Sequence, residues 1–314
     1  MRVRVYDPAT NVGVSGGEEL LDKKGIKWVD VLEPTQPALD VLAARYGLHK
    51  LAIEDCLHLD QRPKIEEYPG HQFIVLQGFS CKGEIHEIKL HEMHFFLGAD
   101  WVITVHSEGH DAIEVAHRRL DADVAATLGR GADFVCYLVA DALVDHNFPL
   151  LDRFNDELED LETDIFEKPT RELLHRAFTL KRNLVQVRRV LSPQRDVVGL
   201  LSRTGIAHVQ DRTSIYFRDI YDHLVRLYEQ IDAARDLIGN TMDVYLSVVA
   251  NKTNDITKQL TLFASIFMPL SFVVGFFGQN FDTLSRWGFF WTSMSICLLL
   301  PLGMVFYFWR RKWL

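Results

Sequence analysis

The amino-acid sequence predicts an α+β (α/β) cytoplasmic domain with a long stalk helix, followed by two C-terminal transmembrane helices. Three observations lead to this prediction. Strand and helix patterns alternate through residues 1–132, residues 211–268 contain no proline and only one glycine, and two stretches of 23 residues near the C-terminus carry no charge. The chain has 314 residues and a net charge of −9, so we expect two or three structural units and no nucleic-acid partner.

Residues 1–132 are expected to form a cytoplasmic α/β domain around a central sheet. Apolar runs bounded by turn or polar residues predict strands at 26–31, 72–79, 86–97 and 101–106. Helices are predicted at 36–47, where Pro34 and Thr35 precede the first turn, and at 111–121. The sequence shows no phosphate-binding glycine loop, nucleophile motif or carboxylate dyad, so we expect neither an enzyme nor a resident cofactor.

Residues 133–258 are expected to form a helical cytoplasmic region. One helical run covers 133–167, and a helix over 171–190 is expected to break near Pro193. Residues 152–167 hold eight acidic side chains, which indicates either a solvated helix face or a surface that concentrates cations.

The stalk helix is predicted from about residue 211. As one helix, residues 211–268 would extend roughly 87 Å. A helix of this length is not stable alone, because its apolar stripe needs partners. The sequence therefore predicts a bundle of identical copies around an axis.

The two uncharged stretches predict transmembrane helices at 259–277 and 287–309, joined by an outer loop at 278–286 and followed by a basic tail at 310–314. About 20 helical residues cross a bilayer core of about 30 Å. Basic residues precede the first span and follow the second: Lys252, Lys258, Arg310, Arg311 and Lys312. The positive-inside rule then places both termini in the cytoplasm and the protein in the cell (inner) membrane. The N-terminal residues lack the apolar segment of a signal peptide.

Steps of three and four along the first span place small, hydroxylated or amide side chains on one helix face. These residues, with the bordering Leu260, are Asn254, Thr257, Leu260, Thr261, Ala264, Met268, Ser271 and Gly275. If identical copies surround an axis, this face lines a pore, although ordinary packing between membrane helices also favours small residues and hydroxyls. The face has no carboxylate, so a cation would pass largely hydrated, and Leu260 and Met268 would form apolar constrictions that gate by dewetting.

The run IFMPLSFVVGFFGQNFDTL at the end of the first span resembles the CorA family of divalent-cation channels. Further stretches resemble the same family in the same order: LAIEDCLHLDQRPKIEEY, HFFLGADWVITVH, LKRNLVQVRRVLSPQRDVV, YFRDIYDH and the tail RRKWL. The resemblance covers nearly the whole chain. It implies a funnel-shaped homopentamer that transports Mg²⁺ or Zn²⁺, with Co²⁺ and Ni²⁺ as further candidates, through a pore lined by the first span.

The resemblance also implies an ion-selectivity ring at the outer mouth, formed by Gly278, Gln279 and Asn280. The amide of Asn280 would hold the metal through its hydration shell. The family signature is Gly-Met-Asn, and a zinc-transporting branch accepts other residues in place of Met, so Gln279 leaves the identity of the ion open. Thr257 stands where the family often has a bulky apolar gate residue, which should weaken any constriction at that level.

Magnesium-transporting members often carry regulatory metal sites between subunits of the cytoplasmic domain. Asp219 matches one acid of such a pair, and Lys82 stands at the position of the other. An ion pair between Lys82 and Asp219 would replace the shared metal, because a lysine repels a cation that a carboxylate would bind. We therefore expect a channel that does not close in response to cytoplasmic magnesium.

Two alternatives to a channel remain open. The first is a zinc-sensing protein or a membrane-anchored metalloenzyme, suggested by the motif His91-Glu92-Met93-His94 with His86, His106 and His110 nearby in the sequence. On a strand, however, His91 and His94 point to opposite faces. The second is a scaffold membrane protein with a non-conducting pore.

Overall fold

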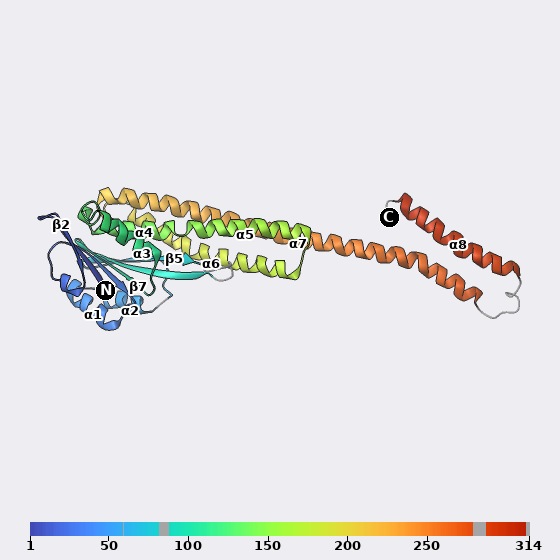
Figure 1. Ribbon diagram of the computed structural model, residues 1–314, viewed down its shortest axis with the longest axis horizontal. Coiled ribbons are helices and arrows are strands. Elements are labelled where there is room, and N and C mark those ends of the chain that lie inside the picture. Colours follow the sequence, from blue (N-terminus) through green and yellow to red (C-terminus); the bar gives the residue numbers. More distant parts are fainter. Residues whose placement is uncertain (59, 82–87, 279–286, 312–314) are drawn as a thin grey trace. The chain divides into compact units, whose positions relative to one another are not determined.

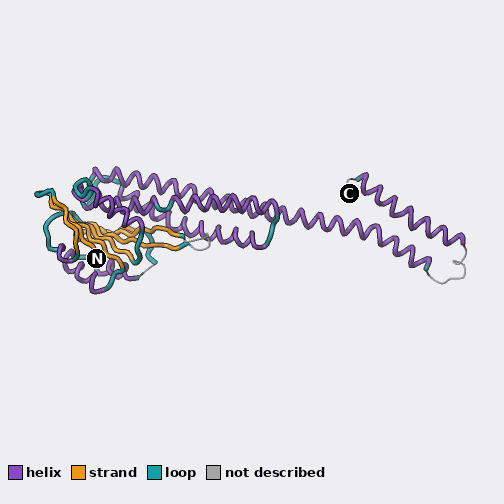
Figure 2. The backbone as a smooth tube through the Cα atoms, viewed as in Figure 1, coloured by secondary structure: helices purple, strands orange, loops and turns teal. Residues whose placement is uncertain are grey.

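The computed structural model describes the chain except residues 59, 82–87, 279–286 and 312–314 (Figures 1 and 2). It consists of two compact units, Met1–Met242 and Asp243–Leu314. The boundary falls within one continuous helix, α7 (Asp211–Phe277), which begins in the first unit and ends in the second.

Seven strands among the described residues form one mixed sheet, in the order β2-β1-β3-β7-β6-β5-β4. Neighbouring strands are antiparallel except β3 and β7, which are parallel. The strands are β1 (Arg2–Asp7), β2 (Val12–Gly16), β3 (Ile26–Leu32), β4 (Lys64–Tyr68), β5 (His71–Ser80), β6 (Lys89–Leu97) and β7 (Trp101–His106). The strands predicted at 26–31, 72–79 and 101–106 are confirmed, as is the described part of the strand predicted at 86–97.

Helices cover both faces of this sheet (Figure 1). On one face, α1 (Gln36–Tyr46) and α2 (Lys50–Leu57) pack onto a core that includes Val29, Leu39, Leu42, Ile53, Phe73, Phe96 and Val105. On the other face lie α3 (Asp111–Ala122) and α4 (Ala132–Asp145). The sheet therefore has two apolar faces, which explains why β5 is buried along nearly its whole length.

The predicted helical run 133–167 is divided in two, because α4 ends at Asp145 and α5 (Phe148–Glu167) begins with Pro149 in its first turn. Asn147, between α4 and α5, anchors this connection to the sheet, because its Oδ1 atom accepts a hydrogen bond of 3.1 Å from the Phe79 N–H of β5. The apolar face of α5 is buried, and its eight acids lie on the remaining surface.

The prediction that the next helix breaks near Pro193 is wrong, because α6 (Arg171–Leu201) continues through this residue. Proline removes one helical hydrogen bond, but buried apolar residues before and after Pro193 pack the helix against the rest of the unit. Gln194 adds a polar anchor, since its fully buried side chain accepts a hydrogen bond of 2.7 Å from the Gln77 N–H.

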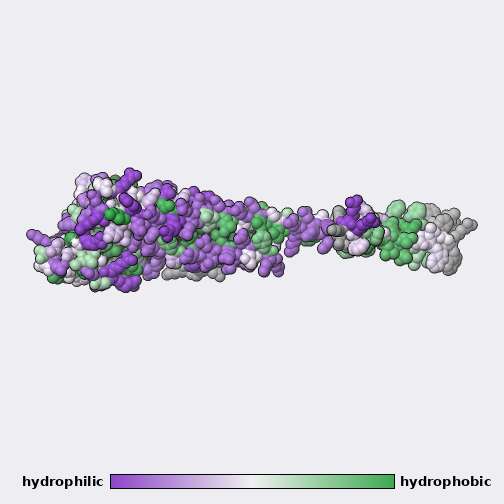
Figure 3. Space-filling model, turned by 90° about the horizontal axis from the view of Figure 1, so that it is seen from above, coloured by the Kyte–Doolittle hydropathy of each residue, from purple (hydrophilic) through white to green (hydrophobic). Residues whose placement is uncertain are grey.

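Three helical stretches in the described chain, the first of them made of α4 and α5, are long and apolar enough to cross a membrane. One of them, over Ala132–Glu167, is mostly buried inside the first unit, so its apolar composition is explained by packing in a globular core. The other two are α7 and the helix α8 (Trp287–Arg310), and their most apolar stretches bury nothing within the chain. Figure 3 shows apolar side chains on the surface of this C-terminal unit. These two helices contain the predicted spans at 259–277 and 287–309.

A buried polar network links the sheet to α3. Asp30 accepts hydrogen bonds of 3.1 Å from both His106 Nε2 and His117 Nε2, and one of 2.7 Å from Thr104 Oγ1. Burial alone would raise the pKa of Asp30, but these hydrogen bonds hold it below its usual value. The Nδ1 atom of His106 lies 2.7 Å from the Glu108 carbonyl, so both ring nitrogens of His106 face acceptors, and this arrangement favours the protonated ring.

Candidate functional site

The predicted pore residues all lie on α7, in the part that belongs to the C-terminal unit. At 100° per residue they fall within an arc of about 120°. Every one of them is exposed in the single chain: Asn254, Thr257, Leu260, Thr261, Ala264, Met268, Ser271 and Gly275. The helix therefore presents one uncharged face of hydroxyl, amide and apolar groups that nothing within the described chain covers.

The two large apolar side chains on this face are strongly exposed. Leu260 is 68% exposed and Met268 is 72% exposed. The Thr261 hydroxyl donates a hydrogen bond of 2.8 Å to the Thr257 carbonyl, so its oxygen still offers lone pairs to water. The face can support a hydrated cation, but it offers no carboxylate that would bind one tightly.

The predicted selectivity residues begin where α7 ends. The Gly278 N–H donates a hydrogen bond of 2.9 Å to the Val274 carbonyl, and a Cβ atom at this position would lie only 2.9 Å from the same oxygen. Glycine is therefore the residue that the end of the helix accepts at position 278. Gln279 and Asn280 lie outside the described residues, and so do Lys82 and His86, so the selectivity ring and the Lys82–Asp219 ion pair stay predictions.

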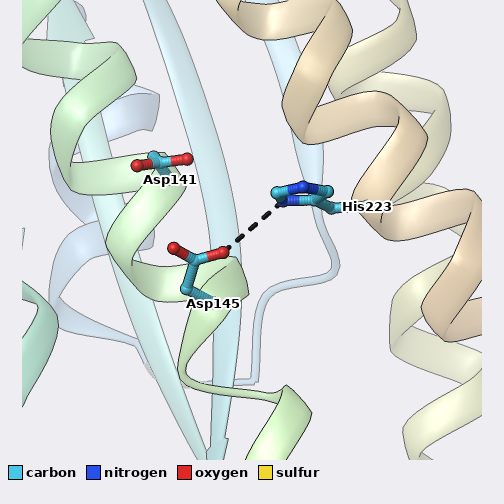
Figure 4. A group of neighbouring side chains, drawn as sticks. All are labelled: Asp141, Asp145 and His223. Atoms are coloured by element: carbon cyan, nitrogen blue, oxygen red, sulfur yellow. Dashed lines mark ion pairs between the residues drawn. The ribbon is translucent and has the colours of Figure 1, made fainter.

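A group of side chains near Asp219 was not predicted. Asp141 and Asp145 lie one turn apart on α4, and His223 faces them from α7 (Figure 4). One ligand atom from each residue lies within 4.8 Å of the others. His223 Nδ1 lies 3.5 Å from Asp145 Oδ1, and its Nε2 lies 4.0 Å from Asp219 Oδ2. Two carboxylates and an imidazole can bind a divalent cation at this position.

The charges in this group are only partly balanced. Burial raises the pKa of Asp141, and although Arg119 donates a hydrogen bond of 3.1 Å to its carboxylate, the neighbouring charge of Asp145 opposes ionisation. A cation would relieve this repulsion. The Asp-x-x-x-Asp spacing at 141–145 places both acids on one helix face and is a visible signal, but the approach of His223 depends on tertiary packing.

The two histidines of the predicted zinc motif are separated by the pleat of β6. His94 is buried and stacks near Phe73, with its ring centre 5.8 Å away. His91 lies on the opposite face, where its ring centre is 5.3 Å from that of His110. The expectation that the two point to opposite faces is confirmed, so they do not form a common site.

Comparisons with known proteins agree over almost the full length of the chain. The family described as CorA-like Mg²⁺ transporter protein matches residues 23–312. A cobalt/magnesium transport protein CorA from Thermotoga maritima is 35% identical over 273 residues, which cover 86% of this chain and 78% of the relative. A putative metal ion transporter, YfjQ, from Bacillus subtilis is 31% identical over 290 residues, covering 91% of this chain and 89% of the relative.

The fold agrees as well. The complete structure of the CorA magnesium transporter from Methanocaldococcus jannaschii superposes with a TM-score of 0.88 at 23% identity. The match covers 100% of this chain and 98% of that structure. The two proteins thus share one fold across both the sheet-containing unit and the C-terminal helices.

Proposed function

The chain belongs to the CorA-like Mg²⁺ transporter family, a family of membrane transporters of divalent cations, and from this premise we propose that it forms a homopentameric channel. In the proposed channel, the first transmembrane helix of each copy lines a common pore. The second transmembrane helix forms an outer ring in contact with lipid.

The observation that carries this proposal is the face of α7 from Asn254 to Gly275. Its residues are exposed in the single chain, uncharged, and small or hydroxylated except at Leu260 and Met268. Hydroxyl and amide groups are costly on a helix surface that contacts lipid, so their presence along one stripe indicates that this stripe faces something other than lipid. A symmetric arrangement of copies places this stripe on the axis, where water and a hydrated cation contact it.

The ring of Gly278, Gln279 and Asn280 is proposed as the outer ion-selectivity site, with Asn280 contacting the hydration shell of the cation. Both termini are proposed to lie in the cytoplasm of a cell with this protein in its inner membrane. In place of a shared regulatory metal, Lys82 and Asp219 are proposed to pair between neighbouring copies, so that cytoplasmic Mg²⁺ does not close the pore.

A flux measurement in liposomes tests the proposal. We expect the purified protein to conduct a divalent cation, Asn280→Ala to abolish the flux, and Mg²⁺ at millimolar concentration on the cytoplasmic side to leave zinc flux unchanged. Zn²⁺ flux that exceeds Mg²⁺ flux would make Gln279 a selectivity residue, whereas dominant Mg²⁺ flux would make it a tolerated variant of the signature.

One control and two further outcomes make the result decisive. Thr292→Ala changes a hydroxyl residue on α8, the proposed second transmembrane helix, whose side chain bonds to its own helix, so flux should persist. An intact pentamer that conducts no divalent cation would contradict the channel proposal and favour the non-conducting scaffold. Particles that contain a single copy would contradict the pore itself, because one helix cannot enclose an axis.

A further inference from the structure

A cavity with an excess of positive charge lies in the N-terminal unit, where α6 passes the start of the edge strand β4. Its volume is about 440 Å³, within the range of about 300–1,000 Å³ that is usual for small-molecule sites. Three arginines and one carboxylate line it: Arg62, Arg182, Arg189 and Asp60. Because the whole chain carries a net charge of −9, this local excess of arginine runs against its composition.

Helix α6 supplies one wall of the cavity. Arg182 and Arg189 are seven residues apart, which is two turns, so they lie on the same side of the helix. Gln186 lies between them on this side and also lines the cavity. The helix therefore directs two guanidinium groups and one amide toward the same space.

The loop between α2 and β4 supplies the facing wall, and buried side chains hold it in place. Glu92 Oε1 accepts hydrogen bonds of 2.6 Å from the Asp60 N–H and 2.9 Å from the Gln61 N–H. Gln77 Nε2 donates a hydrogen bond of 2.7 Å to the Gln61 carbonyl. Glu92 and Gln77 are buried and pair with each other across β5 and β6. The next residue of this anchored loop is Arg62, so the third guanidinium group has a fixed base.

The arginines of the cavity lack the acidic partners that other arginines of α6 have. Three of those others form ion pairs: Arg176 with Glu157, Arg188 with Asp232 and Arg195 with Asp196. Among the residues that the structure describes, Arg62, Arg182 and Arg189 form no hydrogen bond or ion pair, with Asp60 or with any other group. Their N–H donors are therefore available to a ligand.

We propose that this cavity binds a multiply charged anion of the phosphate class, to which Arg62, Arg182 and Arg189 donate hydrogen bonds. The planar fork of a guanidinium group fits two oxygens of a phosphate, and three such groups from two elements suit an anion with several oxygens. A second cavity of about 540 Å³ shares Arg62, Val185 and Arg189 with the first and is also lined by Tyr228. A ligand longer than one phosphate, either a polyphosphate or a nucleoside polyphosphate, can extend along α6 into it.

Asp60 gives the proposed site a signature that a merely basic surface lacks. Its carboxylate lines the cavity and repels a bound phosphate, so removal of this charge should tighten binding. The backbone of Asp60 has a φ of 96°, and asparagine shares with aspartate a tolerance of positive φ. Asp60→Asn therefore removes the charge and keeps the loop conformation.

Equilibrium dialysis of the full-length protein in detergent tests the site, with ATP, tripolyphosphate and inorganic phosphate as probes. Divalent cations are left out, so that a metal held by Asp141, Asp145 and His223 cannot capture the probe. We expect saturable binding of ATP and tripolyphosphate, tighter than that of inorganic phosphate. Arg182→Gln/Arg189→Gln should raise the Kd at least about tenfold. Both changes lie at exposed helix positions where glutamine is a good helix former, so folding should persist.

Two single variants show whether the effect is local. Lys181→Gln removes the same charge from an exposed position beside Arg182 but outside the cavity, so it should leave the Kd unchanged. Asp60→Asn should lower the Kd several-fold. Tighter binding of ATP than of tripolyphosphate would identify a nucleoside polyphosphate as the ligand, whereas equal binding would identify the polyphosphate group alone.

Several results would overturn the proposal. These are a lack of saturable binding by every probe, unchanged affinity in Arg182→Gln/Arg189→Gln, an equal loss in Lys181→Gln, or weaker binding in Asp60→Asn. Size-exclusion chromatography of the double variant adds one more. If this variant separated into smaller assemblies, its arginines would belong to a contact between copies of the chain rather than to an anion site.

Discussion

Helix α7 buries a regular apolar stripe in its first part, whereas its second part exposes apolar side chains on most sides. Between Asp211 and Met242, Phe217, Ile220 and Leu224 are fully buried against the rest of the N-terminal unit. Between Asp243 and Phe277, Phe263 is 62% exposed and Met268 is 72% exposed. One continuous helix thus completes its packing within the chain in the first part and depends on lipid or other copies in the second.

The difference separates two kinds of apolar sequence that hydropathy alone does not distinguish. The α4–α5 region is also apolar enough to cross a membrane, yet it is a core element because its neighbours in the fold cover it. In the part of α7 that is apolar enough to cross a membrane, the uncovered surface is divided into a face of mostly small or polar uncharged groups and large apolar side chains. Such a division is expected of a helix that contacts water on one side and lipid or protein on the other.

The largest expected effect concerns two phenylalanines of the same helix. Phe217→Ala should lower the free energy of unfolding of the N-terminal unit by about 3–5 kcal/mol, because it leaves a cavity in a fully packed site. Phe263→Ala should change it by less than about 1 kcal/mol, because the side chain is not packed within the chain. Urea unfolding of the full-length protein in detergent measures both. Equal losses would mean that the second part of α7 is packed as tightly as the first.

Much of this comparison could be predicted from the sequence. The stretches without charge define the two candidate spans, and the lack of helix-breaking residues from 211 to 268 predicts the continuity of α7. The short elements β1, β2, β4 and α2 were not predicted, because each is stabilised by its neighbours in the sheet or core rather than by a strong local pattern. Pro193 was over-interpreted as a helix break, since tertiary packing on both sides outweighs one lost hydrogen bond.

The candidate sites also differ in how far the sequence predicts them. The uncharged, exposed face of α7 could be predicted because its residues lie on one helix, where spacing alone sets their direction, while its role as a pore lining stays a prediction. The Asp141–Asp145–His223 group combines side chains from α4 and α7. The spacing of Asp141 and Asp145 predicts that they share a helix face, but only the topology of the fold brings His223 to them.

A smaller effect is expected from the constriction on the exposed part of α7. Met268→Ser replaces a large apolar side chain on the proposed pore face with a small hydroxyl, which favours water at that level. We expect divalent-cation flux to rise several-fold in liposomes. Phe263→Ser makes a comparable change outside this face of the helix and should not raise flux. If both variants raised flux equally, the assignment of the pore face would be wrong.

The smallest effect concerns pH and the buried pair of Asp30 and His106 in the N-terminal unit. Burial would lower the pKa of His106, but its hydrogen bond and charge interaction with Asp30 raise it above the usual value. The stabilisation from His106 is therefore fully present below the unfolded pKa of about 6.5 and is lost as the pH rises through the folded value. The pKa of Asp30 is lowered, so its contribution is present above about pH 4 and is lost only in stronger acid.

The contribution of His106 is therefore measured as a difference: between about pH 6 and about pH 8 the free energy of unfolding in urea should fall with pH in the unaltered protein relative to His106→Gln, because the opposite contributions of His71 and His110 are common to both. His106→Gln keeps a hydrogen-bond donor toward Asp30 but cannot carry the charge, so it lacks this contribution. His175→Gln, on the exposed side of α6, should leave the slope of the unaltered protein unchanged. Equal slopes in the unaltered protein and in His106→Gln would mean that another group in the N-terminal unit takes up the proton. The pH dependence of folding would then have to be assigned to a group other than the Asp30–His106 pair.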